Sequence, residues 1–196
     1  MRSGLILAGG ASRRFGRPKA FEAVRGRAMV AWVADALETR TDELVVSVAD
    51  EDQTRRMHAL LPKARIVADE RKDRGPIEGL DRGLRAARGD LVVVAPCDAP
   101  LLKVALLDLL LKRIGRHDAA VPRLAAFDPV RAVYRRATAL HVLDADSDRI
   151  GSPSALVDRL DAAFVDEADL RAVDPDLSSF VDVNALDDLA RAEAAY

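Results

Sequence analysis

Short apolar runs alternate along the chain with segments in which apolar residues recur every three or four positions. Four runs have the length and branched side chains typical of strands: Leu5–Ala8, Leu44–Val48, Arg65–Ala68 and Leu91–Ala95. Four segments between and after them have the spacing of helices: Met29–Leu37, Gln53–Leu61, Ile77–Ala87 and Val104–Ile114. Strands that are apolar on both faces are typical of parallel sheets covered by helices.

The second half of the chain is less regular. Its pattern predicts strands over Ala119–Val121 and Val130–Tyr134, a helix capped by Ser152 with Pro153 in its first turn, and a last helix that begins at Asn184. The alternation of strands and helices predicts one α/β domain over residues 1–196, with an open and mostly parallel sheet. Such sheets bind ligands at the carboxyl ends of their strands, so the segments that follow the strands hold the candidate residues.

The segment after the first strand has the features of an anion-binding loop. Gly9 and Gly10 allow a sharp turn that exposes backbone N–H groups. Four positive charges follow within seven residues: Arg13, Arg14, Arg17 and Lys19. The alternative is a plain turn with solvated arginines. Neither the Walker pattern nor the dinucleotide-binding pattern fits the spacing of these glycines and Lys19.

The segment after the third strand contains Asp69 and the pair Gly75-Pro76, which indicates a junction between a loop and a helix. Gly79, one turn into that helix, allows another group to approach closely. A charged surface loop is the alternative interpretation of this segment.

Asp98 lies between Pro96 and Pro100, directly after the most strongly apolar strand. A restrained carboxylate there suits Mg²⁺, which binds one or two carboxylates together with phosphate oxygens. The alternative is that Asp98 caps the helix that follows. Cys97 is interpreted as a packing residue. Near the end of the chain, Asp182 and Asn184 share a face if this segment is a strand, and Asn184 is also suited to cap the last helix.

Composition narrows the possible functions. The 196 residues carry 30 basic and 32 acidic side chains, and the formal charge of −2 argues against nucleic acids and anionic membranes as partners. The single cysteine excludes an intramolecular disulfide, and the histidines at 58, 117 and 141 form no metal-binding motif. No apolar run approaches the length of a membrane span, so we expect a cytoplasmic protein.

The four segments, in this order, resemble the molybdenum cofactor guanylyltransferase family of nucleotidyltransferases. The matching motifs are Leu7-Ala8-Gly9-Gly10-x-Ser12-x-Arg14-Phe15-Gly16-x-x-Lys19, Gly75-Pro76-x-x-Gly79-Leu80, Pro96-Cys97-Asp98-x-Pro100 and Val181-x-Val183-Asn184. The resemblance implies a three-layer, Rossmann-like nucleotidyltransferase fold of the α/β class with a mostly parallel central sheet. It also implies transfer of GMP from GTP to the phosphate of molybdopterin, with release of pyrophosphate.

The resemblance assigns roles to individual residues. Arg14, Lys19 and Asp98 are the implied catalytic residues, and Asp98 and Asn184 are the implied ligands of an Mg²⁺ cofactor. The implied nucleotide-binding residues are Leu7, Ala8, Gly9, Gly10, Ser12, Arg14, Lys19, Asp50, Asp69, Gly75, Pro76, Gly79 and Asp98. Transient contact with molybdoenzymes or with cofactor-delivery proteins is also expected.

Base choice and the acceptor site are less well defined by the sequence. Pro18, Asp50 and Asp182 depart from the guanylyltransferase pattern, and Gly-x-Pro-Lys is more typical of cytidylyltransferases. A cytidylyltransferase, or another enzyme acting on a phosphate monoester, is therefore the first alternative, and a non-catalytic nucleotide-binding protein is the second. For the acceptor, four arginines of the second half are candidates to meet a second anionic group: Arg123, Arg131, Arg135 and Arg136.

Overall fold

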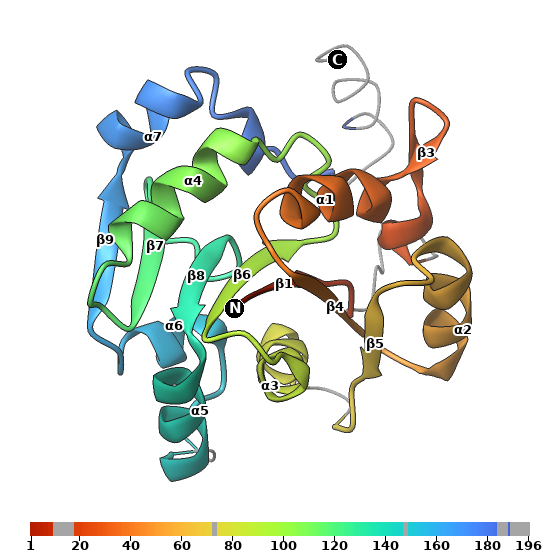
Figure 1. Cartoon of the computed structure of the whole chain (residues 1–196), viewed down its shortest axis with the longest axis horizontal. Coiled ribbons are helices and arrows are strands. Elements are labelled where there is room, and N and C mark those ends of the chain that lie inside the picture. The colour runs from red at the N-terminus through yellow and green to blue at the C-terminus, as the bar shows by residue number, and fades with distance from the viewer. Residues whose placement is uncertain (10–17, 72–73, 147–148, 184–187, 189–196) are drawn as a thin grey trace.

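A seven-stranded sheet forms the centre of a computed structural model that describes residues 1–9, 18–71, 74–146, 149–183 and 188 (Figure 1). The strands lie in the order β5-β4-β1-β6-β8-β7-β9. Their bounds are β1 Arg2–Leu7, β4 Glu43–Val48, β5 Arg65–Ala68, β6 Leu91–Pro96, β7 Ala119–Arg123, β8 Ala132–Arg135 and β9 Ala162–Asp166. Neighbouring strands are parallel except where β8 pairs with β6 and β7. The expected α/β fold with a mostly parallel sheet is confirmed.

The central strand β1 shows why the strand segments are continuously apolar. Leu5 and Leu7 belong to a buried cluster on one face of the sheet, whereas Ile6 belongs to a second cluster on the other face. All three side chains are at least nine-tenths buried. Because helices cover both faces, every position along such a strand favours an apolar residue.

Two groups of helices cover these faces (Figure 1). The cluster around Ile6 includes residues of α1 Met29–Glu38, α2 Glu51–Leu60, α4 Val104–Arg113 and α7 Glu167–Val173. The cluster around Leu5 includes residues of α3 Pro76–Ala86, α5 Arg136–Ala145 and α6 Pro153–Val157. The four helices expected in the first half are confirmed with shifts of one or two residues at their ends. The Ser152 cap is also confirmed, because its hydroxyl oxygen accepts a hydrogen bond of 3.1 Å from the N–H of Ala155.

Some elements lie beyond what the sequence pattern predicts. They are β9, the helices α5 and α7, and a short hairpin of β2 Ala23–Val24 and β3 Arg27–Ala28. Residues 181–183 are not a strand, so the expected strand alternation of Asp182 does not apply. The predicted helix from Asn184 lies outside the described residues apart from Asp188. Within the described ranges, no helix has the length and apolar character needed to cross a membrane.

Candidate functional site

The ends of β1, β4, β5 and β6 meet at the carboxyl edge of the sheet. The N–H of Ala8 donates to the carbonyl of Ser47 at 2.8 Å, and the N–H of Cys97 donates to the carbonyl of Leu7 at 3.1 Å. On the far side of β4, the N–H of Asp69 donates to the carbonyl of Val48 at 2.9 Å. These bonds extend the sheet ladders beyond the strands, so the segments that carry three of the sequence motifs lie side by side.

Two of the predicted catalytic side chains contact each other at this edge. The Nζ atom of Lys19, in the short 3-10 helix Lys19–Phe21, lies 2.7 Å from the Oδ2 atom of Asp98. The two side chains are only 21% and 15% exposed. Opposite charges separated by 79 positions in sequence thus form a largely buried pair. The alternative that Asp98 caps the next helix is wrong, because α4 begins after Lys103 and has no side-chain cap.

A second carboxylate, that of Asp182, lies close to this pair. The N–H of Val183 donates to the carbonyl of Asp98 at 2.9 Å, which brings the segment 181–183 against the end of β6. Burial raises the pKa of Asp182; the guanidinium of Arg131 opposes that rise, and the negative charge of Asp98 adds to it. The site therefore holds two neighbouring acids.

Arg131 restrains the side chain of Asp182. Its side chain is 4% exposed, and its guanidinium donates to the carboxylates of Asp128 and Asp182 and, at 2.9 Å, to the carbonyl of Ser179. A buried guanidinium with three acceptors is strongly restrained. We interpret Arg131 as part of the scaffold of the site rather than as a ligand-binding group.

The chemistry of these donors fits a magnesium ion. The segment that carries Asp182 is bonded to Asp98, and the charge of Asp98 acts on Asp182. Mg²⁺ prefers carboxylate and phosphate oxygens and usually keeps several waters. Asp98 and Asp182 supply hard oxygen donors without completing a cage, since the described residues contain no group of three or more His, Cys, Asp or Glu suited to a metal. Asn184, the other predicted ligand, lies outside the described residues.

Asp69 lies in an unusual environment after β5. Its Oδ1 atom is buried and has no hydrogen-bond partner among the described residues, and its Oδ2 atom lies against Gly9. A Cβ atom added to Gly9 would lie 2.9 Å from that oxygen, so only glycine fits there without displacement. Burial and the nearby charge of Glu78 raise the pKa of Asp69 to about 6, although Arg82 opposes the rise. The Oδ1 atom of Asp69 is therefore a buried acceptor for which the described residues supply no donor.

The Gly75-Pro76 pair forms the junction that the sequence predicts. Gly75 has a φ of +67°, a conformation that favours glycine, and Pro76 begins α3. Gly79 packs against β4, because a Cβ atom there would lie 2.8 Å from the hydroxyl oxygen of Ser47. The close approach at Gly79 is therefore made to the sheet.

The remaining predicted residues have different surroundings. Asp50 is exposed and caps α2, where its Oδ1 atom accepts a hydrogen bond of 2.8 Å from the N–H of Gln53. Cys97 is buried, and burial raises the pKa of its thiol well above the ordinary range, which confirms its interpretation as a packing residue. The predicted site residues Gly10, Ser12 and Arg14 lie outside the described residues.

The arginines expected near an acceptor all have partners within the protein. Arg123 pairs with Asp166, and Arg131 is held as described above. Arg135 donates to the carbonyl of Gly115, and Arg136 donates to the carbonyl of Leu84, each at 2.9 Å. The structure therefore gives no support to this set as an anion-binding group.

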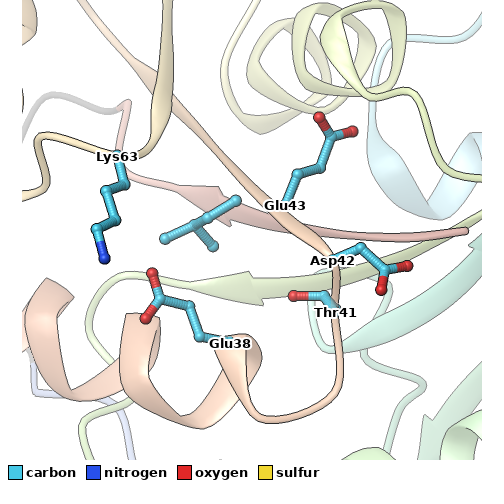
Figure 2. Close-up of a pocket in the computed structure, with 6 residues that line it drawn as sticks. Glu38, Thr41, Asp42, Glu43 and Lys63 are labelled. Atoms are coloured by element: carbon cyan, nitrogen blue, oxygen red, sulfur yellow. The ribbon is translucent and has the colours of Figure 1, made fainter.

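A separate cavity of about 250 Å³ lies at the opposite, amino end of β4 (Figure 2). Its lining consists of Glu38, Thr41, Asp42, Glu43, Leu44 and Lys63. None of the predicted site residues contributes to it. The amino edge of the sheet therefore has a cavity, whereas the residues with candidate chemistry lie at the carboxyl edge.

Comparison with known proteins identifies the family of the chain. Residues 4–167 match the MobA-like NTP transferase domain. The chain is 31% identical to a probable molybdenum cofactor guanylyltransferase of Methanosarcina acetivorans, over 96% of this chain and 88% of that protein. It is 35% identical to a molybdenum cofactor guanylyltransferase of Desulfosudis oleivorans, over 98% and 95% of the two chains.

Solved structures give the same answer for the fold. The molybdopterin-guanine dinucleotide biosynthesis protein A of Archaeoglobus fulgidus superposes with a TM-score of 0.83 at 28% identity, over 98% of this chain and 97% of that one. The 2-C-methyl-D-erythritol 4-phosphate cytidylyltransferase of Thermus thermophilus is 20% identical and shares the fold, with a TM-score of 0.70 over 97% and 96% of the chains. The resemblance noted in the sequence is confirmed: the chain belongs to the MobA-like NTP transferase family and is a nucleotidyltransferase of the molybdenum cofactor guanylyltransferase kind.

Proposed function

We propose that this enzyme transfers GMP from GTP to the phosphate of molybdopterin and releases pyrophosphate. The single observation that carries the proposal is the contact of Lys19 with Asp98 at the carboxyl edge of the sheet, which unites the two motif side chains suited to phosphate and metal. The names of the relatives from Methanosarcina acetivorans and Desulfosudis oleivorans favour guanylyl transfer over other nucleotidyl transfers.

The reaction asks the protein for positioning and for neutralisation of charge. An oxygen of the acceptor phosphate forms a bond to the α-phosphorus of GTP, and the bond from that phosphorus to the bridging oxygen of the β-phosphate breaks. Pyrophosphate leaves with the electron pair. Because the acceptor oxygen is already ionised at neutral pH, the step needs no general base.

Lys19 is the residue that meets the phosphates in this proposal. Its ammonium group is already desolvated and oriented by Asp98. A preorganised cation stabilises the negative charge that develops on the leaving pyrophosphate more effectively than a solvated cation. Arg14 and the backbone amides of residues 9, 10 and 12 are proposed to hold the same phosphates.

Asp98 and Asp182 are proposed to hold Mg²⁺, together with Asn184. When bound, the ion supplies positive charge between the two phosphate groups, which otherwise repel each other. Arg131 keeps Asp182 oriented toward the site, and Lys19 reduces the repulsion between the two carboxylates before the substrates bind.

Asp69 is proposed to accept hydrogen bonds from the nucleotide. Within the described part of the chain, its buried Oδ1 atom has no donor, and a guanine base presents N–H donors on the edge that pairs with other bases. Leu7, Ala8 and Gly9 are proposed to contact the nucleotide through their backbone, next to Asp69. Gly75, Pro76 and Gly79 are proposed to shape this side of the nucleotide site, and Asp50 stays a predicted contact.

The test is the release of pyrophosphate by the purified protein with Mg²⁺, molybdopterin and each of GTP, CTP, ATP and UTP in turn. We expect release with GTP alone. Release with CTP instead would make the enzyme a cytidylyltransferase. Binding of GTP without release of pyrophosphate from any nucleotide would overturn the proposed transfer and favour a binding role.

A further inference from the structure

A second acid near Asp69, Glu78, has no role in the proposed reaction. It stands in the first turn of α3 and is 3% exposed. Its Oε1 atom accepts hydrogen bonds from the backbone N–H groups of Glu70 at 3.3 Å and Arg71 at 3.1 Å. Burying a carboxylate costs folding free energy unless it is hydrogen-bonded, and these two hydrogen bonds offset that cost.

These bonds fix the segment that carries Asp69. Residues 70 and 71 follow Asp69 directly, so Glu78 ties the segment to the start of α3. Arg74 lies 3.7 Å from the Oε2 atom of Glu78 and adds a partly exposed positive charge. Glu78 therefore restrains the backbone directly after Asp69, while the N–H of Asp69 is held by the carbonyl of Val48.

Two charged side chains shift the pKa of Asp69 in opposite directions. Among the described residues, Glu78 and Arg82 are the two whose charges act on it directly, and both belong to α3. Arg82 lies 2.6 Å from Glu70, so part of its positive charge is neutralised by that partner. Glu78 has two backbone donors, whereas the Oδ1 atom of Asp69 has none among the described residues. The raised pKa of Asp69 therefore makes this carboxylate ready to accept a proton in mildly acidic solution.

We propose that Glu78 is a positioning residue for nucleotide binding, which anchors the Asp69–Arg71 segment and sets the pH below which Asp69 stops accepting hydrogen bonds from the nucleotide. This inference rests on the proposed function, in which Asp69 contacts the nucleotide. Protonated Asp69 carries an O–H donor where an N–H donor of the base must be accepted. GTP binding therefore weakens as the solution becomes acidic.

The size of the effect follows from the pKa of Asp69, which is about 6. One pH unit below its pKa, a carboxyl group is roughly nine-tenths protonated, so we expect about a tenfold loss of affinity for GTP at pH 5. Glu78→Gln keeps an oxygen for the two backbone N–H groups and removes the charge. Arg82→Gln removes the opposing positive charge, so its effect has the opposite sign.

The experiment measures the dissociation constant of GTP by titration calorimetry from pH 5 to pH 8, in wild type, Glu78→Gln and Arg82→Gln. The control is Asp81→Asn, which removes an acid from the same helix that pairs with Arg85. The dissociation constant of each variant is divided by that of wild type at the same pH, because this ratio cancels the effect of protonation of GTP itself. We expect Glu78→Gln to bind several-fold tighter than wild type at pH 5 and about equally at pH 8. The Arg82→Gln ratio moves the other way, and the Asp81→Asn ratio stays constant.

A merely structural role for Glu78 predicts a ratio that does not change with pH, and that result would overturn the inference. A ¹³C NMR titration of the Asp69 carboxyl in the free wild-type protein provides a second measurement that needs no variant. A midpoint near pH 6 supports the inference, and a midpoint below pH 5 contradicts it. If GTP fails to bind at any pH, the proposed function fails, while the same NMR titration repeated in Glu78→Gln still decides whether the charge of Glu78 raises the pKa of Asp69.

Discussion

Glu43 at the amino edge of the sheet and Asp69 at the carboxyl edge are held in opposite ways. At the amino edge, Glu43 accepts hydrogen bonds from the hydroxyl of Ser3 at 2.7 Å and the N–H of Arg88 at 2.6 Å. Burial opposes ionisation of Glu43, but these bonds together with the positive charges of Arg65 and Arg88 outweigh it and lower its pKa. At the carboxyl edge, Asp69 has a raised pKa and an oxygen with no hydrogen-bond partner in the described ranges.

This difference separates a structural acid from one that is available to a ligand. A carboxylate whose charge is stabilised by hydrogen bonds within the protein contributes to the stability of the fold, whereas an unpartnered buried acceptor costs stability until a ligand supplies the donor. The amino edge therefore has a cavity that none of the predicted site residues lines, whereas the carboxyl edge has the residues suited to bind a ligand (Figure 2). Only the second has both the chemistry and the incomplete bonding of a binding site.

The largest expected effect concerns the lysine at the carboxyl edge. Lys19→Ala removes the cation that meets the leaving pyrophosphate, so we expect kcat/KM for pyrophosphate release to fall roughly 10²–10³-fold. The matched control is Lys63→Ala at the amino edge, where the side chain lines the cavity and the rate should stay unchanged. A loss of less than tenfold for Lys19→Ala, or equal losses for the two variants, would remove the distinction between the edges.

The next effect concerns the metal. Asp98→Asn replaces a charged oxygen donor with a neutral one, so we expect the Mg²⁺ concentration for half-maximal rate to rise about 10–100-fold. Asp42→Asn is the control. Asp42 accepts a hydrogen bond from the N–H of Arg2 at the amino edge of the sheet, whereas Asp98 lies at the carboxyl edge. An unchanged magnesium titration for Asp98→Asn would contradict its proposed role.

A smaller effect is expected on the stability of the free protein at the carboxyl edge. The pKa of Asp69 is raised in the folded state, so its contribution to stability is complete below about pH 4 and is lost as the pH rises through about 6. Asp69→Asn should therefore raise the free energy of unfolding by about 1–2 kcal/mol at pH 7.5, relative to its effect at pH 4. Urea denaturation at the two pH values measures this, and equal effects at both would refute it. The same variant should bind GTP more weakly.

The smallest effect has the reverse sign and belongs to the amino edge. The pKa of Glu43 is lowered, so its contribution is present at neutral pH and is lost as the pH falls below its ordinary value of 4.5. Glu43→Gln should lower the free energy of unfolding by roughly 1 kcal/mol at pH 7, with less effect in acid. The same urea experiment checks it. A variant that is more stable than wild type at pH 7 would show that the hydrogen bonds of Glu43 do not outweigh its burial.

The sequence predicted the parallel half of the sheet because double-sided burial leaves a continuous apolar run, as in Leu5, Ile6 and Leu7. It missed elements whose signal is weak. The hairpin turns at Arg25 and Gly26, both with positive φ, and arginine is an uncommon residue for such a turn. The strand β9 is short and depends on pairing with β7, which no local pattern reports.

Some residues of the candidate site could likewise be predicted from the sequence, and others could not. Lys19, Asp98 and Asp69 could be found because each follows a strand, and parallel strands bring their carboxyl ends to one edge. Glu78 could not be found, and Arg131 was expected at the acceptor rather than in the scaffold of the site, because the roles of both depend on partners from distant or backbone groups. Asp50 illustrates the limit of position alone, since it also follows a strand but caps a helix at the surface.

The most direct test of the central claim follows the phosphorus atom that is transferred. The protein is incubated with Mg²⁺, molybdopterin and GTP labelled with ³²P at the α-phosphate, and the products are separated by chromatography and identified by mass. The account predicts that the label moves into a product that contains both guanosine and the pterin, while unlabelled pyrophosphate is released. Label that stays in bound GTP, or that leaves as free GMP, would contradict it.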